Sequence, residues 1–419
     1  MATKTTTLSS RDTGILRRLA ARVASLAQDP VNLERKRLWY ALDEGRSGRP
    51  MVLAEVGGIL DEVAPAFGAL QCEDPQARAI EQGFRVQIWQ FDVLRDDHVI
   101  EPCFNVNWSV DPGNYGVQSV PHTVDNNGRL ASRSWEPPLK NLDGDFAKLR
   151  PRAFAVDREA TLAAQEKWDT LFGDLLPVRI RGAFWWTLGM TIRAIDLIGL
   201  ESLMLSMYDN PDGLHRLMRF LCDDHLAFAR WLEREGLLNL NNANDYIGSG
   251  SMGYTRQLPA AGRQDGAPVR TKDLWALLES QETVGVGPEL FEAFIFPYQR
   301  EIAQAFGRCY YGCCEPVHTR WHVLKQLPHL ARVSVSPWAD EAFMARELGD
   351  RFVYSRKPNP ALISTERFDE AAIRADLRRT LDLARGCRVE IIMKDVHTVN
   401  NDPSRLPRWV ELARREIGA

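Results

Sequence analysis

Short apolar runs alternate with longer amphipathic segments along most of this chain. Each run is rich in apolar and β-branched residues and stops at glycine or polar residues, which is typical of strands. The expected strands are residues 51–56, 178–184, 237–241, 274–278, 309–312, 332–336, 351–355 and 389–393.

The segments between these runs carry apolar residues at helical spacing. Several of them begin with Pro or Asp in the first turn, as helix caps do. The expected helices are residues 188–235, 287–306, 316–327, 340–348, 369–384 and 403–417. Strands that alternate with helices run parallel and are joined by right-handed crossovers. The pattern therefore predicts an α/β fold, a (β/α)8 TIM barrel.

Three segments depart from the alternation. Residues 1–45 carry helix signals before any strand and predict a helical lead-in outside the barrel, which spans residues 46–419. Residues 97–150 hold many Gly, Pro and Asn residues and predict a long excursion after the first strand. Residues 249–272, rich in Gly, Ser and Arg, predict a mobile loop over the barrel mouth, because long irregular segments in compact folds usually carry function.

Composition narrows the function classes. The 419 residues are 45% hydrophobic and 26% charged, enough for a sizeable core. The net charge is −4 with no basic stripe, which argues against a nucleic-acid partner. No run approaches the roughly 20 apolar residues of a membrane span, and the first residues lack the apolar core of a secretory signal. We expect a cytoplasmic protein that acts on a small molecule, with no membrane partner.

The cysteines point to a candidate metal site. They are seven in number and irregularly spaced, which predicts free thiols rather than a disulfide framework. Cys313 and Cys314 directly follow the run 309–312, and Glu315 and His318 come next. Such ligands at the carboxyl end of a barrel strand predict a zinc site. On an extended strand the two thiols would face opposite sides, so both can bind one metal only if the strand has ended.

Polar and aromatic side chains also follow the other expected strands. The carboxyl ends of parallel strands meet at one face of a barrel, so these residues predict a polar cup with aromatic walls. Asp395 and His397 share one side of an extended chain, and imidazole titrates near neutral pH, which suits proton transfer. We expect substrate to be bound by Glu55, Trp186, Asn242, Asp245, Tyr246, Lys357 and Lys394, and catalysis to use Glu279, Asp395 and His397.

Several local strings carry a family resemblance. Residues 181–189, Arg-Gly-Ala-Phe-Trp-Trp-Thr-Leu-Gly, resemble a Gly-Pro-Phe-Thr-Leu segment. Residues 279–282, Glu-Ser-Gln-Glu, followed by the Pro-x-x-Phe and Pro-Tyr pairs of residues 288–298, resemble an acidic strand end and its helix. From about residue 175 onward the chain resembles the uroporphyrinogen decarboxylase superfamily, in its branch of zinc-dependent, cobalamin-linked methyltransferases.

The resemblance implies a zinc ion that binds a thiol as thiolate. Cys313 matches the first cysteine of the branch's His-x-Cys-Gly motif, whereas Tyr311 replaces its histidine and Cys314 its glycine. Residues 357–360 hold no cysteine where the last ligand of the branch would lie. We therefore expect Cys313 and Cys314 to bind zinc together with Glu282 and His318, with Glu315 and His397 as alternatives.

The expected function is metal-assisted methyl transfer on a small methylated substrate, with a corrinoid or a thiol as the other methyl carrier. The resemblance implies a corrinoid on a separate partner protein, since the chain has no Asp-x-His-x-x-Gly string. Two alternatives stay open. A lyase of the decarboxylase branch would hold carboxylates with Lys394 and Lys357 and need no metal, but the Arg-rich amino-terminal signature of that branch is absent. A non-catalytic binding protein would account for the missing zinc ligands.

Overall fold

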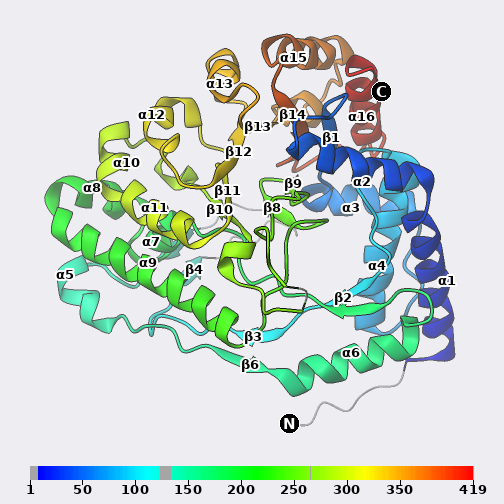
Figure 1. The fold of residues 1–419 in the computed structure, drawn as a ribbon, viewed down its shortest axis with the longest axis horizontal. Helices are drawn as coiled ribbons and strands as arrows, with labels where there is room; N and C mark the ends of the chain where they lie inside the picture. The colour runs from blue at the N-terminus through cyan, green and yellow to red at the C-terminus, as the bar shows by residue number, and fades with distance from the viewer. Residues whose placement is uncertain (1–7, 123–133, 265, 419) are drawn as a thin grey trace.

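Six parallel strands form the main sheet of this α/β protein, as a computed structural model shows (Figure 1). The structure describes residues 8–122, 134–264 and 266–418. Residues 1–7 of the expected lead-in, 123–133 of the expected excursion and 265 of the expected loop lie outside this description. In spatial order the strands are β1 (Met51–Ala54), β14 (Arg388–Met393), β13 (Val353–Arg356), β12 (Leu330–Val335), β11 (Arg308–Tyr311) and β10 (Trp275–Leu278).

All neighbouring strands of this sheet are parallel, and β1 pairs with β14 although they are its first and last strands in the chain. Every residue of β1, β10, β11 and β13 is buried. Parallel sheets are covered by helices on their faces, so their strands have continuous apolar runs instead of alternation. This is why the sequence pattern located these six strands.

The two other expected strands do not join this sheet. Residues 178–184 begin as β7 (Val178–Ile180), which pairs with β2 (Phe104–Val106) in a separate two-stranded sheet. Residues 237–241 have no strand conformation. At the free edge of β1 the Asp97 backbone N–H donates to Val52 O at 2.8 Å, and at the free edge of β10 the Asn241 side chain bonds to the backbone N and O of Trp275. Irregular segments thus bond to both edges: one lies at the start of the expected excursion, and the other lies where the sequence predicted a strand.

Helices surround the main sheet. The single helix expected over residues 188–235 is three helices, α7 (Thr191–Ile198), α8 (Leu200–Asp209) and α9 (Pro211–Arg234). Gly199, with φ +82°, separates the first two, and the Asn210 side chain caps α9, which starts at Pro211. The later helices are α10 (Pro288–Phe294), α11 (Phe296–Ala305), α12 (Trp321–Leu324), α13 (Glu341–Leu348), α14 (Ala361–Ser364), α15 (Glu370–Leu383) and α16 (Arg405–Glu416).

The amino-terminal part forms a second core beside the sheet. Two helices, α1 (Ser10–Ala27) and α2 (Pro30–Asp43), precede β1, and α1 packs on α4 (Pro75–Trp89). Phe84 of α4, Phe104 of β2 and Phe172 of α6 (Arg158–Phe172) are in contact in this core. The remaining elements are α3 (Leu60–Val63), β3 (Ser109–Asp111), β4 (Val120–His122), β5 (Ser134–Glu136), α5 (Leu142–Asp145), β6 (Ala155–Asp157), β8 (Tyr246–Gly248) and β9 (Ser251–Met252).

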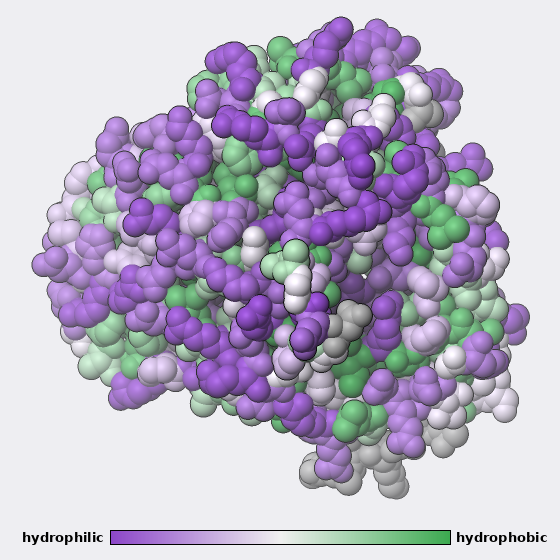
Figure 2. All heavy atoms as spheres, in the orientation of Figure 1, coloured by the Kyte–Doolittle hydropathy of each residue, from purple (hydrophilic) through white to green (hydrophobic). Residues whose placement is uncertain are grey.

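The surface is mainly hydrophilic on the face that Figure 2 shows, with hydrophobic residues in small separate groups. None of the helices in the described part of the chain has the length and apolar character that crossing a membrane requires.

Candidate functional site

Strand β11 ends just before the two adjacent cysteines. Its last residue is Tyr311, and Gly312 follows with φ +97°. A Cβ atom at Gly312 would lie 3.1 Å from side-chain atoms of Ser334 and Val317, so glycine suits both this backbone conformation and this space. The turn brings Cys313 Sγ to 3.6 Å from Cys314 Sγ. The two thiols therefore lie side by side, because the strand has ended before them.

A lysine and a carboxylate from the end of β14 face these thiols. Lys394 Nζ lies 3.7 Å from Cys313 Sγ and 3.3 Å from Asp395 Oδ1. Asp395 Oδ2 lies 3.3 Å from Cys314 Sγ, and Ser249 Oγ accepts a hydrogen bond from Lys394 Nζ at 3.4 Å. We call these five residues the thiol–lysine cluster. Cys313 and Lys394 are buried, whereas the Asp395 side chain is 45% exposed, so solvent reaches the cluster from that side.

The two cysteines have opposite electrostatic environments. A hydrogen bond from the Cys314 thiol, together with the Lys394 ammonium, lowers the pKa of Cys313 although burial opposes this. The same hydrogen bond, with burial, raises the pKa of Cys314. Burial lowers the pKa of Lys394. The nearby Cys313, Tyr246 and Asp395 raise it by more, so the pKa of Lys394 is raised. The cluster thus favours a thiolate on Cys313 and an ammonium on Lys394.

Glu315 fixes the loop that carries the thiols. Its carboxylate accepts hydrogen bonds from the backbone N–H of Ser280 at 2.9 Å and of Cys313 at 2.8 Å, which ties the loop after β10 to the loop after β11. Burial raises the pKa of Glu315 even though these hydrogen bonds oppose it. The sequence placed this residue among the alternative metal ligands, and its contacts show that it positions Cys313.

The two expected acids after β10 lie next to this loop and are both bonded to threonines. Glu279 is fully buried and accepts hydrogen bonds from Thr187 Oγ1 at 3.0 Å and from the Gln281 backbone at 3.1 Å. Burial, reinforced by Glu282 and Glu315, raises the pKa of Glu279. Glu282 accepts a hydrogen bond from Thr191 Oγ1 at 2.6 Å. Burial therefore favours the protonated form of Glu279, which can donate as well as accept.

The expected zinc ligands do not come together as a set. His318 accepts a hydrogen bond from the Asp340 backbone at the start of α13, and Glu282 is bonded to Thr191. Beside Cys313 the partner is an ammonium, which carries the charge that a metal would bring. Among the residues that the structure describes, no three or more His, Cys, Asp and Glu side chains are grouped to hold a metal ion. The donor set does not fit zinc, which needs four ligands in structural sites and three in catalytic ones.

Some of the expected substrate-binding residues lie beside the cluster. Glu55 directly follows β1, and burial raises its pKa. The Lys394 ammonium lowers this pKa, whereas the Asp395 carboxylate raises it. Tyr246 helps to raise the pKa of Lys394. Trp186 lies beside Tyr246 and is 45% exposed. These residues leave an aromatic, half-exposed wall next to the cluster.

The other expected residues have structural partners. Asn242 donates to Leu258 O at 2.6 Å, and Asp245 is paired with Arg181 at 2.7 Å. Lys357 is buried and donates to Tyr310 OH at 3.1 Å and to Ser355.

His397 is exposed on the loop after β14 and lies next to Gly58. In the contacts of the described residues it is not joined to the thiols. Ser249 is the cluster residue that sequence reasoning did not single out. Ser249 lies in the Gly- and Ser-rich segment that the sequence predicted as a loop over the barrel mouth, so the sequence indicated this region but not this residue.

Comparison with known proteins gives a fold relationship. No family model and no curated protein matches the chain. Among solved structures the chain is similar to a methyltransferase from Methanosarcina mazei, with 13% sequence identity and a TM-score of 0.53. The similarity covers 92% of this chain and 99% of that chain. At this identity the likeness shows a shared fold.

Proposed function

We propose that this protein is a methyltransferase whose methyl acceptor is a thiol activated in the thiol–lysine cluster. The observation that carries the proposal is the buried ammonium of Lys394, 3.7 Å from the buried sulfur of Cys313. A site that stabilises a sulfur anion generates the nucleophilic form of a thiol, because the thiolate is the reactive species. The fold shared with a methyltransferase supports methyl transfer as the reaction.

Two residues of the cluster, Cys313 and Lys394, have roles in this reaction. The Cys313 thiolate accepts the proton of the acceptor thiol R–SH, and the Lys394 ammonium stabilises the new thiolate. The acceptor sulfur then forms an S–C bond with the methyl carbon of the donor CH3–X, while the C–X bond breaks and X leaves with its electron pair. The proton on Cys313 passes to X where X is basic, and to water where X is a corrinoid. The products are R–S–CH3 and the released X with one proton, and Cys313 is a thiolate again.

The donor and the finer architecture belong to the same proposal. The resemblance of the sequence suggests a small methylated molecule, or a methyl corrinoid on a partner protein, as CH3–X. It also suggests that the six-stranded sheet and the segments at its two edges form a (β/α)8 barrel. The seven free cysteines suit a reducing compartment such as the cytoplasm. No step is assigned to zinc, since the described donor set does not fit that metal.

The proposal is tested with methylcobalamin as methyl donor and 2-mercaptoethanol as acceptor. The measurement is the rate at which the methyl thioether forms, followed by mass spectrometry. Lys394→Met and Cys313→Ser should each lower this rate about a hundredfold or more, the usual effect of removing proton transfer and charge stabilisation. Lys272→Met and Cys387→Ser, outside the cluster, are the matched controls and should keep the rate. Two outcomes would contradict the proposal. One is an equal rate in all four variants, and the other is that neither the unmodified chain nor any variant forms the thioether.

A further inference from the structure

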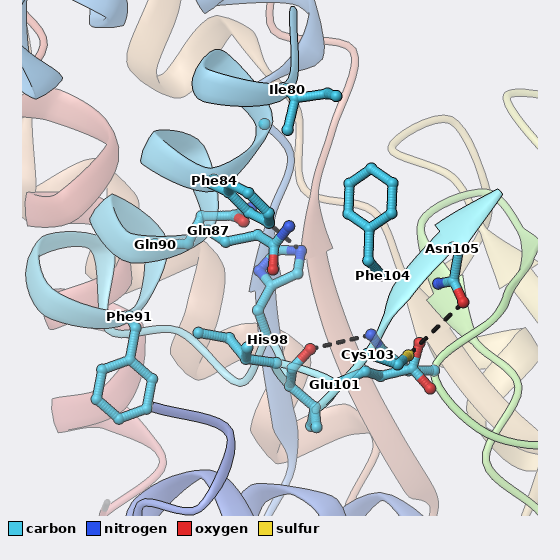
Figure 3. A pocket seen from close by; sticks show the side chains of 14 residues that line it. Ile80, Phe84, Gln87, Gln90, Phe91, His98, Glu101, Cys103, Phe104 and Asn105 are labelled. Carbon is cyan, nitrogen blue, oxygen red and sulfur yellow. Dashed lines mark hydrogen bonds between the residues drawn. The ribbon is translucent and has the colours of Figure 1, made fainter. Parts of the chain in front are cut away.

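A cavity that none of the residues of the thiol–lysine cluster line lies between helix α4 and strand β2 (Figure 3). Its volume is about 440 Å³, within the range of small-molecule sites. Phe84 and Gln87 of α4 line one side, and Phe104 and Asn105 of β2 line the other. The rings of Phe84 and Phe104 meet edge to face with centroids 6.0 Å apart and form an apolar wall.

The charged groups in this cavity are neutralised by partners. Apart from one thiol, its lining holds two ionisable residues, which are His98 and Glu101. His98 Nδ1 lies 2.6 Å from Asp96 Oδ2, and Glu101 Oε2 lies 2.6 Å from Arg181 Nη1. Because each of these two side chains has its counter-charge within hydrogen-bond distance, neither offers an unpaired charge to a ligand. An ionic ligand would enter without a partner and lose its hydration, so a neutral ligand is favoured.

Two side-chain amides in the lining are available to a ligand. Within the described part of the chain the Gln87 amide has no hydrogen-bond partner, and Asn105 has only the Cys103 thiol, 3.6 Å from its Oδ1. Each amide offers two N–H donors and one carbonyl acceptor. A ring amide satisfies such an amide with two hydrogen bonds, because its N–H and C=O lie side by side.

We propose that this cavity binds a neutral, planar heteroaromatic molecule that carries a ring amide. The phenyl wall takes the apolar face of the ring system, and Gln87 and Asn105 pair with the N–H and C=O of its edge. The proposal is independent of the methyl transfer, because binding here is measured without a methyl donor and without the cluster. Failure of one proposal therefore leaves the other standing.

Quinazolin-4(3H)-one is the probe, with binding to the full-length chain measured by isothermal titration calorimetry. Gly83 lines the cavity, and a Cβ atom there would meet nothing within 4 Å, so Gly83→Leu fills the space without displacing a neighbour. This variant should weaken binding about tenfold or more, whereas Gly14→Leu on α1 controls for replacing a helical glycine. Gln87→Leu should weaken it about three- to tenfold, the effect of one lost hydrogen bond.

Naphthalene, which lacks the ring amide, should bind at least about tenfold more weakly than quinazolinone. Three results would each overturn the proposal. One is no heat of binding for quinazolinone up to about 1 mM. Another is equal affinity in Gly83→Leu and the unmodified chain. The last is tighter binding of the anion quinoline-4-carboxylate than of quinazolinone.

Discussion

Removing the ammonium of Lys394 should raise the pKa of the Cys313 thiol and lower the amount of its thiolate at neutral pH. Two unit charges 3.7 Å apart attract by about 4 kcal/mol at an effective dielectric constant of about 20. Asp395, 3.3 Å from the same nitrogen, shares this ammonium, so we take about half, roughly 2 kcal/mol, as its contribution to the thiolate. Since 1.4 kcal/mol is a factor of ten, Lys394→Met should lower the ionisation constant of the Cys313 thiol about thirtyfold, and its thiolate fraction by up to that factor.

Alkylation by iodoacetamide reports this fraction, because the thiolate and not the thiol reacts. The peptide that contains Cys313 and Cys314 is followed by tandem mass spectrometry, which separates the two sites. Measured at pH 7, Cys313 should react up to about thirtyfold more slowly in Lys394→Met, and the difference should vanish at a pH where Cys313 is ionised in both proteins. Lys394→Arg keeps the charge and should react close to the unmodified rate, and Lys272→Met controls for the loss of any lysine.

A rate in Lys394→Met within twofold of the unmodified chain between pH 6 and 9 would refute the reasoning. It would mean that the sulfur and the ammonium are not an ion pair, and the proposed activation of an acceptor thiol would lose its basis. Thermal unfolding of each variant checks that the fold is kept.

Three further outcomes follow from the structure. Burial lowers the pKa of Lys357 to about 7, below the value of about 10.4 in an unfolded chain, so the unfolded state binds more protons between these pH values. The free energy of unfolding should therefore rise with pH across this window by up to about 1.4 kcal/mol per pH unit, and urea unfolding of Lys357→Met should lack the rise. Gly312→Ala should destabilise the protein more than Gly386→Ala, by about 1 kcal/mol in urea unfolding, since both have positive φ but only Gly312 is crowded. The purified protein should hold less than one zinc per chain and keep thioether formation in EDTA, and stoichiometric zinc lost in Cys313→Ala would contradict this.

The sequence predicted the fold best where burial is complete. The six strands of the main sheet are mostly apolar because both faces are covered, and their approximate ranges follow from that pattern. Residues 237–241 have the same apolar character, but the Asn241 side chain satisfies the edge of β10 in place of a backbone ladder. Periodicity cannot distinguish these two solutions, because both bury the same side chains. The long helix expected over residues 188–235 was wrong for a similar reason, since amphipathic spacing continues across Gly199 and Pro211.

The candidate site was predictable as a region and not as a set of contacts. Cys313, Lys394 and Asp395 lie together because they follow strands whose carboxyl ends share one face. His318 follows the same strand as Cys313, yet the turn of the chain after Glu315 directs it to Asp340. Such directions depend on backbone turns a few residues long, which residue types alone do not specify.

The charge balance of the cluster explains why proton exchange between two thiols suits it. Lys394 supplies one positive charge, and Cys313 and Asp395 both compete for it. A second thiolate beside an ionised Cys313 would add a negative charge with no partner in a largely buried site, at a cost of several kcal/mol. If the acceptor gives its proton to Cys313, the net charge does not change and the ammonium serves the acceptor sulfur instead. The acceptor can therefore become nucleophilic only as Cys313 becomes neutral, which is why removing either residue of the pair should lower the transfer rate about a hundredfold or more while binding in the α4–β2 cavity remains.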